Sequence, residues 1–382
     1  MNCRDKFNAV LSFEPEAKIP KVEYGYWAGT IRSWFEDGLP RVRDLPDELL
    51  DGELIYSSAP LTPASDGKND HNVGTFFGLD HNATKFPLDM SPRLPKRVLE
   101  ETDQYLVFCD RFGITQKTVK VGASVPMELE APVRTAADWD AYKQHYEDDF
   151  QGRLPDDWET VAAILKQRDF PVRLGGNPFG FLGFPRHLMG TTGYLMGLYD
   201  QPELIKDINE FSLQFVMKYW SAILERLDVD CVFIFEDMSY KTGSLISIDL
   251  FNEFLAPYYV RLIDFLKQYG VTNILVDSDG LVEQLIPHWL KVGITGVFPM
   301  EAVNDLSELR RQYPRLQMMG GIDKRVLISG TRKQIDEELE KTASLIRSGG
   351  YIPHIDHSVS MDAKWENFVY YRNRLNDIID NL

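Results

Sequence analysis

Residues 273–280, which read N-I-L-V-D-S-D-G, decide the fold that we predict for this chain. The apolar run 274–277 predicts a short buried strand, which ends in Asp-Ser-Asp-Gly before a helix predicted over 281–292. Side chains alternate between the two faces of a strand, so Asp277 and Asp279 are expected to point to the same side. The C-terminal end of a strand that a helix follows is where barrel enzymes keep their chemistry.

The alternation of strand and helix recurs through the C-terminal half of the chain. Five strands, each followed by a helix, are predicted at residues 230–236, 273–277, 295–299, 316–320 and 351–355. Pro257 should kink the helix predicted over 249–269. Five such units in succession favour a parallel sheet. With two more candidate strands, at 21–27 and 171–175, and no glycine-rich nucleotide motif, the predicted fold is a (β/α)8 TIM barrel of the α/β class.

The N-terminal part of the chain does not follow this alternation. Residues 1–150 are predicted to form an extension that contributes the first barrel strand, with residues 1–90 largely irregular. Strands at 105–109 and 114–121, joined by Asp-Arg-Phe-Gly, predict a β-hairpin that caps one end of the barrel. Residues 151–382 are predicted to hold the main part of the barrel.

Composition restricts the class of protein. The 382 residues include 41 basic and 58 acidic side chains, a net charge of -17, and no basic patch of the kind that nucleic acid requires. No apolar run is long enough to cross a membrane, and the N-terminus lacks the layout of a signal peptide. The three cysteines are too far apart to suggest a disulfide framework. We therefore expect a cytoplasmic protein that binds neither nucleic acid nor membrane.

Every one of the five predicted strands ends near a carboxylate. These strand ends carry Glu236 and Asp237, then Asp277 and Asp279, then Glu301, then Asp323, and finally Asp356 between His354 and His357. Such a cluster can bind a cation such as Zn²⁺, or mutual repulsion can raise some pKa values and create general acids. Simpler roles are open for three of them: an ion pair or helix cap for Asp323, a core histidine for His354 and a turn cap for Asp237.

Aromatic side chains are predicted near the same end of the barrel. Phe179 and Phe181 lie in a glycine-rich loop, and Tyr24, Tyr26 and Trp27 lie in the first candidate strand. They would form the wall of a site for a flat or apolar substrate. Ordinary packing of a lid explains them equally well.

Two motifs resemble those of a known superfamily. The sequence G-Y-I-P-H-I-D-H at 350–357, followed by Asn367, and G-G-I-D-K-R at 320–325 are similar to the uroporphyrinogen decarboxylase-like superfamily. The resemblance covers most of the chain from about residue 24 onwards. It implies a (β/α)8 barrel and one of two chemistries: decarboxylation of uroporphyrinogen, or methyl transfer that involves corrinoid proteins, thiols or folate.

The resemblance also distinguishes the decarboxylases of this superfamily from its methyltransferases. Decarboxylases of this superfamily carry an arginine-containing R-Q-A-G-R-Y segment, whereas the matching residues 23–29 contain no arginine. Thiol methyltransferases bind zinc through an H-x-C pair and a later cysteine. Asp277 and Asp279 stand at the H-x-C position here, and His357 stands at the later cysteine, where decarboxylases also place a histidine. The change from soft to hard ligands suits the oxygen of an ether rather than a thiol.

We therefore expect a methyltransferase that moves a methyl group from a small methoxylated, aromatic substrate to a corrinoid carried by a separate protein. Zinc is the expected cofactor, although a carboxylic acid could protonate the ether oxygen without metal. The predicted metal ligands are Asp277, Asp279, Glu301 and His357; the predicted catalytic residues are Asp279, Glu236 and His357; the predicted substrate-binding residues are Tyr24, Tyr26, Trp27, Phe179, Phe181, Asp237, Asp323 and His354.

Three alternatives stay open at this point. They are uroporphyrinogen decarboxylase, a methyltransferase with tetrahydrofolate as acceptor, and an inactive barrel that binds a ligand or partner. Assembly as a homodimer is also left open.

Overall fold

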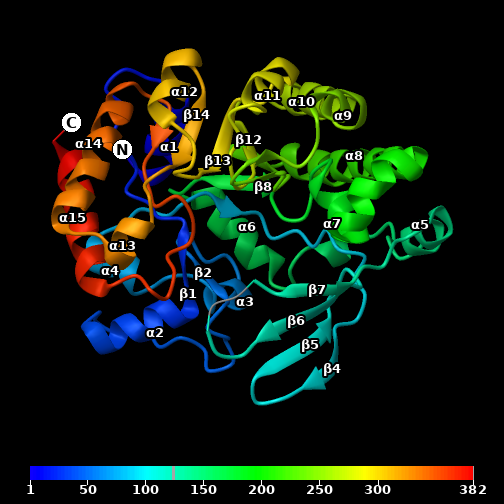
Figure 1. Ribbon diagram of the computed structural model, residues 1–382, viewed down its shortest axis with the longest axis horizontal. Coiled ribbons are helices and arrows are strands. Elements are labelled where there is room, and N and C mark those ends of the chain that lie inside the picture. The colour runs from blue at the N-terminus through cyan, green and yellow to red at the C-terminus, as the bar shows by residue number, and fades with distance from the viewer. Residues whose placement is uncertain (123–124, 382) are drawn as a thin grey trace.

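A curled parallel sheet of seven strands forms the centre of the protein, and helices cover its outer face (Figure 1). The computed structural model describes residues 1–122 and 125–381. The strands follow the order β15-β14-β13-β12-β9-β8-β3. Their bounds are β3 Thr84–Lys85, β8 Val172–Gly175, β9 Cys231–Phe235, β12 Ile274–Asp277, β13 Gly296–Met300, β14 Gln317–Gly320 and β15 Tyr351–Ile352. The predicted α/β fold of TIM-barrel type is confirmed.

The segment 21–27 lies between the two outer strands of this sheet. On one side, the Asp80 amide, just before β3, donates to the Lys21 carbonyl at 2.7 Å. On the other, the Val359 amide, after β15, donates to the Gly25 carbonyl at 3.0 Å. Only Gly25–Trp27 of the predicted strand is regular (β1), and it pairs antiparallel with β2, Leu54–Tyr56. The sheet is therefore closed by an irregular segment rather than by an eighth parallel strand.

The helices of the C-terminal half follow the predicted order, with differences at several positions. Their bounds are α1 Cys3–Leu11, α2 Ala28–Asp37, α3 Pro63–Asp66, α4 Val73–Phe77, α5 Ala136–Lys143, α6 Trp158–Gln167, α7 Gly183–Asp200, α8 Pro202–Leu224, α9 Ile248–Phe254, α10 Ala256–Gln268, α11 Ile286–Val292, α12 Leu306–Gln312, α13 Arg325–Ser329, α14 Arg332–Arg347 and α15 Trp365–Asp380. Pro257 does break its helix, because α9 ends at Phe254 and α10 begins at Ala256. Helices α1, α3 and α4 lie in the part predicted to be irregular, and α13 was not predicted.

The helix after β12 begins later than predicted. The amides of Leu281 and Val282 donate to the Tyr240 carbonyl and to Asn304 Oδ1, so the first residues after the strand bond to neighbouring loops. The short hairpin that Leu281 contacts is formed by β10, Ser239–Tyr240, and β11, Gly243–Ser244. Tertiary contacts therefore replace the first helical turn.

A separate four-stranded antiparallel sheet projects from one side of the barrel (Figure 1). Its strands are β4 Arg97–Glu101, β5 Tyr105–Cys109, β6 Thr115–Val119 and β7 Met127–Glu130. The predicted β5–β6 hairpin is confirmed, and its turn is held by Asp110 Oδ1, which accepts the amides of Phe112 and Ile114 at 2.8 and 3.0 Å. Strands β4 and β7 were not predicted. The division into residues 1–150 and 151–382 stays a prediction.

A buried ion pair joins the last helix to the closing segment. Arg372 on α15 lies 2.8 Å from the Glu23 carboxylate, and both side chains are fully buried. The Tyr371 hydroxyl and the Ile355 amide donate to the same carboxylate. These bonds compensate for burial of the charges and fix the position of residues 23–27 at the edge of the barrel.

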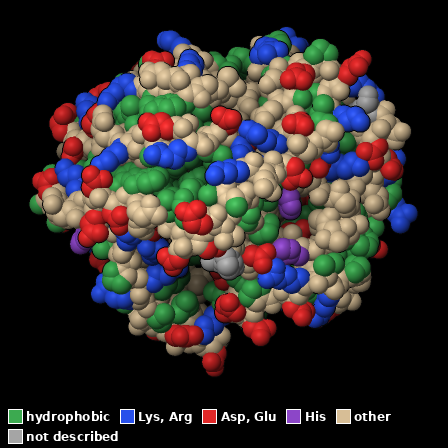
Figure 2. Space-filling view, turned by 180° about the vertical axis from the view of Figure 1, so that it is seen from behind, with side chains coloured by type: hydrophobic (Ala, Val, Ile, Leu, Met, Phe, Trp, Pro, Cys, Tyr) green, Lys and Arg blue, Asp and Glu red, His purple; other side chains and the backbone are tan. Residues whose placement is uncertain are grey.

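The surface carries charges of both signs. Acidic and basic side chains are interspersed over the face shown in Figure 2, with apolar side chains between them. Over the described residues, no helix is long and apolar enough to cross a membrane.

Candidate active site

The side chains of Asp277 and Phe298 lie on the inner face of the curled sheet. Asp277 is paired in register with Phe235 on β9 and with Phe298 on β13, so these side chains share a face. Tyr24, from the closing segment, stacks on Phe298 with ring centroids 5.3 Å apart. Because β13 is no neighbour of that segment in the sheet, this contact crosses the barrel interior.

Asp277 and Asp279 are the two acids at the centre of this site. Burial raises the pKa of Asp277 to about 7, with Asp237 adding to the shift and Arg173 opposing it. Burial also raises the pKa of Asp279 to about 8, and the like charges of Asp237 and Glu301 raise it further. An ordinary aspartate has a pKa near 4. At neutral pH, Asp279 therefore holds its proton most of the time and can act as an acid.

His357 lies beside Asp279. Its Nε2 is 3.6 Å from Asp279 Oδ2, within ion-pair range but longer than a direct hydrogen bond. Its ring stacks on Tyr24 at 4.7 Å, and Nδ1 lies 2.9 Å from Ser358 Oγ. Burial lowers the pKa of His357 to about 4, so the imidazole is neutral near pH 7. A protonated acid and a neutral base thus face each other.

Glu236 has a different environment, which does not support the predicted catalytic role. Its carboxylate is fully buried and accepts the amides of Phe181, Leu182 and Gly183 at 2.6–2.9 Å. The Tyr259 hydroxyl donates to it as well. Its oxygens are therefore occupied by the loop that precedes α7, and Glu236 holds that loop in place.

The two phenylalanines of that loop are buried with protein around them. Phe181 packs against Tyr259 at 5.1 Å and is 2% exposed, so it belongs to the core rather than to a substrate wall. Phe179 stacks on Phe184 at 4.8 Å and also lines a small cavity near β8. Of the pair, only Phe179 keeps contact with a space that a ligand could enter.

Two of the aromatic residues of the closing segment lie away from the acids. Tyr26 is fully buried between Trp34 and Phe368, in a second hydrophobic cluster outside the barrel. Trp27 is the N-cap residue of α2. Tyr24 and Tyr26 would share a face of a regular strand, but Tyr24 precedes β1 and stacks on Phe298 and His357 in the interior instead. The structure thus does not support substrate binding by Tyr26.

The remaining predicted residues form pairs of their own. Asp237, at a left-handed φ of 42°, forms an ion pair with Arg186 of α7 at 2.7 Å. Glu301 accepts the Gly280 amide at 2.8 Å and lies 3.8 Å from Lys324. Both carboxylates adjoin Asp279, which explains their effect on its pKa.

Asp323 and His354 do not join this group. Asp323 pairs with Arg325 at 2.6 Å, which corresponds to the simpler of its two predicted roles. His354 is fully buried, its Nδ1 lies 2.7 Å from the Ile355 carbonyl, and burial lowers its pKa to about 4. It packs against Tyr24 and Phe298 as a neutral core histidine.

The predicted metal ligands are only partly brought together. Asp279 and His357 are adjacent, but Glu301 is engaged by Gly280 and Lys324. Within residues 1–122 and 125–381, no three His, Cys, Asp or Glu side chains form a group that could hold a metal ion. The side chains as placed therefore do not fit zinc, which needs at least three protein ligands.

Sequence reasoning missed two cations of the barrel interior, Lys85 and Arg173. Both act on Asp277, where they oppose the rise of its pKa. Arg173 lies in a predicted strand. A charged residue within that apolar run could have indicated a functional side chain. Lys85 lies in the part predicted to be irregular, where no strand was predicted.

The chain is similar in sequence to a known protein family. The family named uroporphyrinogen decarboxylase (URO-D) matches residues 103–375. A uroporphyrinogen decarboxylase from Anaeromyxobacter sp. (strain Fw109-5) is 26% identical over 238 residues, 61% of this chain and 65% of that protein. The match thus spans slightly less than two thirds of that relative.

A solved structure agrees with the fold. A methyltransferase from Methanosarcina mazei superimposes with a TM-score of 0.59 and 15% identity, over 100% of this chain and 99% of the other. At that identity the likeness supports the fold alone. The family match covers well over half of the chain, so the protein belongs to the uroporphyrinogen decarboxylase (URO-D) family, whose members include decarboxylases and methyltransferases.

Proposed function

We propose that the protein is the substrate-side methyltransferase of an O-demethylation system. It would take a methyl group from a small methoxylated aromatic compound, and a reduced corrinoid on a separate protein would supply the nucleophile that accepts it. One observation carries the proposal: Asp279, with a pKa raised to about 8, stands 3.6 Å from a neutral His357 inside the barrel. An acid that is still protonated near pH 7 is what cleavage of an ether requires.

The proposed step needs one proton. The bond between the ether oxygen and the methyl carbon breaks, and its electron pair stays on the oxygen. Asp279 donates its proton to that oxygen, so the product leaves as a neutral phenol rather than as a phenolate. Solvent then returns a proton to the Asp279 carboxylate. Asp237, Glu301 and Asp277 assist because their negative charges favour the protonated form of Asp279.

Uroporphyrinogen decarboxylase is the second candidate, favoured by the sequence of the Anaeromyxobacter relative. Its substrate carries eight carboxylates, which would meet the acidic group around Asp279. Two nearby cations, Arg186 and Lys324, already lie close to the carboxylates of Asp237 and Glu301. Repulsion between like charges therefore weighs against this candidate, because the remaining cations beside Asp277, Lys85 and Arg173, are too few to balance eight carboxylates. A folate-dependent methyltransferase differs only in the acceptor.

The deciding experiment measures both reactions with the same preparation. Methyl transfer from methoxylated aromatic compounds to free cob(I)alamin would be followed beside decarboxylation of uroporphyrinogen. We expect methyl transfer, lost in Asp279→Asn and kept in Asp323→Asn, a matched change at an acid outside the group. Decarboxylation without methyl transfer would overturn the proposal.

Zinc binding by Asp277, Asp279, Glu301 and His357 stays a prediction that metal analysis of the purified protein tests. Activity that survives removal of bound metal by a chelator would support the acid route. Stoichiometric zinc that is lost in both Asp279→Ala and His357→Ala would instead require the side chains to rearrange around the ion.

A further inference from the structure

Two cations lie side by side on the inner wall of the barrel, one on β3 and one on β8. Lys85 and Arg173 are direct partners in the parallel register of these strands, so their side chains share a face. The Arg173 guanidinium lies over the Phe233 ring at 4.8 Å, and Phe233 belongs to the strand that pairs with the one ending in Asp277. Both cations therefore face the chamber that holds the acids.

Neither cation has a carboxylate of its own. Within the described part of the chain, neither takes part in a salt bridge of 4.0 Å or less. Lys85 Nζ donates to the Asn177 carbonyl at 3.2 Å, and Arg173 donates to the carbonyls of Ala83 and Gly175. Carbonyl groups are neutral, so these bonds leave two positive charges uncompensated.

The two nearest acids do not cancel this charge. Asp89 is engaged elsewhere, because it pairs with Arg111 at 2.7 Å and accepts the Ser91 hydroxyl. Within the described residues, Asp277 forms no salt bridge of 4.0 Å or less with either cation. Lys85 is exposed and Arg173 is partly buried, so within the described part of the chain both can donate charge-assisted hydrogen bonds to an anion.

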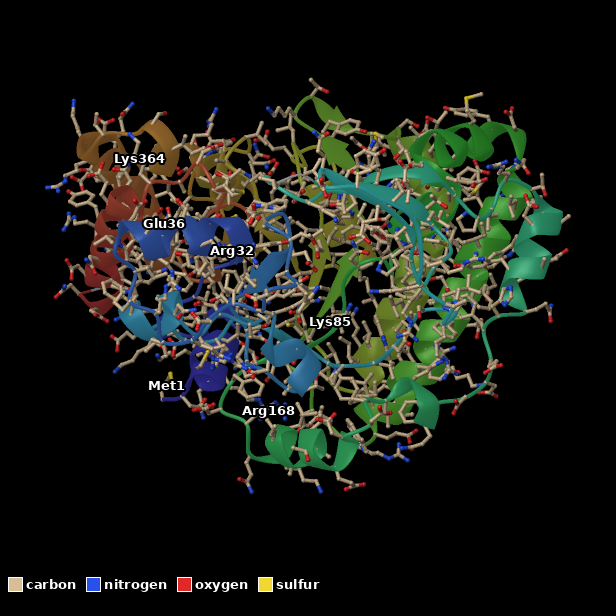
Figure 3. The ribbon with its side chains drawn as sticks, turned by 90° about the horizontal axis from the view of Figure 1, so that it is seen from below. Met1, Arg32, Glu36, Lys85, Arg168 and Lys364 are labelled. Atoms are coloured by element: carbon tan, nitrogen blue, oxygen red, sulfur yellow. The ribbon has the colours of Figure 1, made fainter. Side chains whose placement is uncertain are left out.

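The ammonium group of Lys85 is also accessible. The side chain is exposed, and it lines a cavity of about 150 Å³ whose wall includes Asn177, Phe112 and Phe179. Figure 3 shows Lys85 near the middle of the molecule, apart from the other labelled charged side chains. A ligand can therefore reach it without displacing a protein partner.

Contacts between aromatic rings connect Arg173 with the acids. The Phe233 ring, over which Arg173 lies, packs against Phe298 at 4.7 Å, and Phe298 stacks on Tyr24 at 5.3 Å. Tyr24 also stacks on His357. This series of ring contacts leads from Arg173 to His357, which lies 3.6 Å from Asp279.

We infer that Lys85 and Arg173 bind an anionic group of the substrate, so that the methyl donor is an aromatic methyl ether that also carries a carboxylate. This inference rests on the proposed function. The carboxylate would accept charge-assisted hydrogen bonds from the two cations, while the methoxy oxygen lies at Asp279. The anchor at one end then fixes which methoxy group of the ring reaches the acid.

The test compares two ligands of the same shape. Binding of 4-methoxybenzoate and of the neutral 4-methoxybenzamide would be measured by calorimetry, without corrinoid. We expect the wild type to prefer the benzoate by about tenfold or more, the range for a hydrogen bond to a charged group. Lys85→Gln should abolish most of this preference, and Lys85→Arg should retain it. Lys333→Gln, a change at an exposed lysine of α14, should have no effect.

The outcomes separate the inference from the proposed function. Equal binding of the two ligands by the wild type, or a preference that survives in Lys85→Gln, would overturn the anion site. Demethylation of neutral methoxyarenes alone would overturn it too while the proposed function stands. A benzoate preference that depends on Lys85, without methyl transfer, would support the anion site and reject the methyltransferase.

Discussion

The ends of β9 and β12 are neighbours in the sheet, and each carries a carboxylate pair, yet the two regions do different work. At β9, Glu236 accepts three amides and a hydroxyl from the protein. At β12, Asp279 has a half-exposed side chain, 40% accessible, and the nearest side-chain nitrogen, that of His357, is 3.6 Å away. A carboxylate at a strand end is thus structural when protein donors occupy it, and available for chemistry when they do not.

Two glycines, Gly180 and Gly280, explain why Glu236 is surrounded by protein donors and Asp279 is not. A Cβ atom at Gly180 would lie 1.9 Å from the Phe235 carbonyl oxygen and 2.7 Å from Glu236 Cδ. The loop before α7 can therefore come close enough to surround Glu236 only because it has no side chain there. After β12, the chain turns at Gly280 with φ 83°, which directs its amide to Glu301 and leaves Asp279 free.

The largest effect that we expect is on the rate of demethylation, after substitution of Asp279 at the end of β12. Asp279→Asn keeps the shape of the side chain but removes the acid, so the rate of demethylation should fall by about 10²–10⁴-fold. The wild-type rate should also decline as pH rises through about 8, the pKa to which burial and neighbouring acids raise Asp279. Initial rates between pH 6 and 9 measure both effects. A normal rate in Asp279→Asn would contradict the assignment.

At β9, the same kind of change should act on stability. Glu236→Ala would leave three buried amides without an acceptor, at a cost of about 3 kcal/mol or more in the free energy of unfolding. Urea denaturation would measure the loss, and Glu236→Gln is the matched control because it keeps one acceptor oxygen. If Glu236→Ala folded as stably as the wild type, the loop would not depend on this carboxylate.

A smaller effect concerns Asp277 and the pH dependence of stability. Burial raises its pKa in the folded state to about 7, so the folded protein binds this proton more tightly than the unfolded chain does. The resulting stabilisation is complete below pH 4 and is lost as pH rises towards 7. Asp277→Asn should therefore gain stability relative to the wild type between pH 5 and pH 8. A constant difference across that range would argue against the shifted pKa.

The smallest effect is expected at Asp323. Its two predicted roles, substrate binding and a simple ion pair, can be separated by substitution. Its partner Arg325 is 79% exposed, and exposed ion pairs contribute about 0–1 kcal/mol. Asp323→Asn should leave methyl transfer unchanged and lower the thermal midpoint only slightly. A loss of activity as large as that of Asp279→Asn would place Asp323 in the catalytic group after all.

Much of the fold could be predicted because its signals are local. Apolar runs, glycines and Pro257 mark the strands and helix ends within a few residues, and the C-terminal strands lie where the pattern indicated. The prediction was wrong where contacts between distant residues determine the local conformation. Residues 281–285, for example, bond to Tyr240 and Asn304 instead of forming a helical turn. Short helices in the N-terminal part have too little periodicity to be detected.

The sequence by itself determined the alternation of the five C-terminal strands with helices and the set of acids at the strand ends, because both depend on residue type and local spacing. It could not separate Glu236 from Asp279. Only the tertiary structure decided that Glu236 is surrounded by amides, that His357 and Tyr24 stack beside Asp279, and that Lys85 is next to Arg173. These contacts join residues far apart in the chain. The pKa values of Asp279 and His357 depend on burial, which exists only after folding.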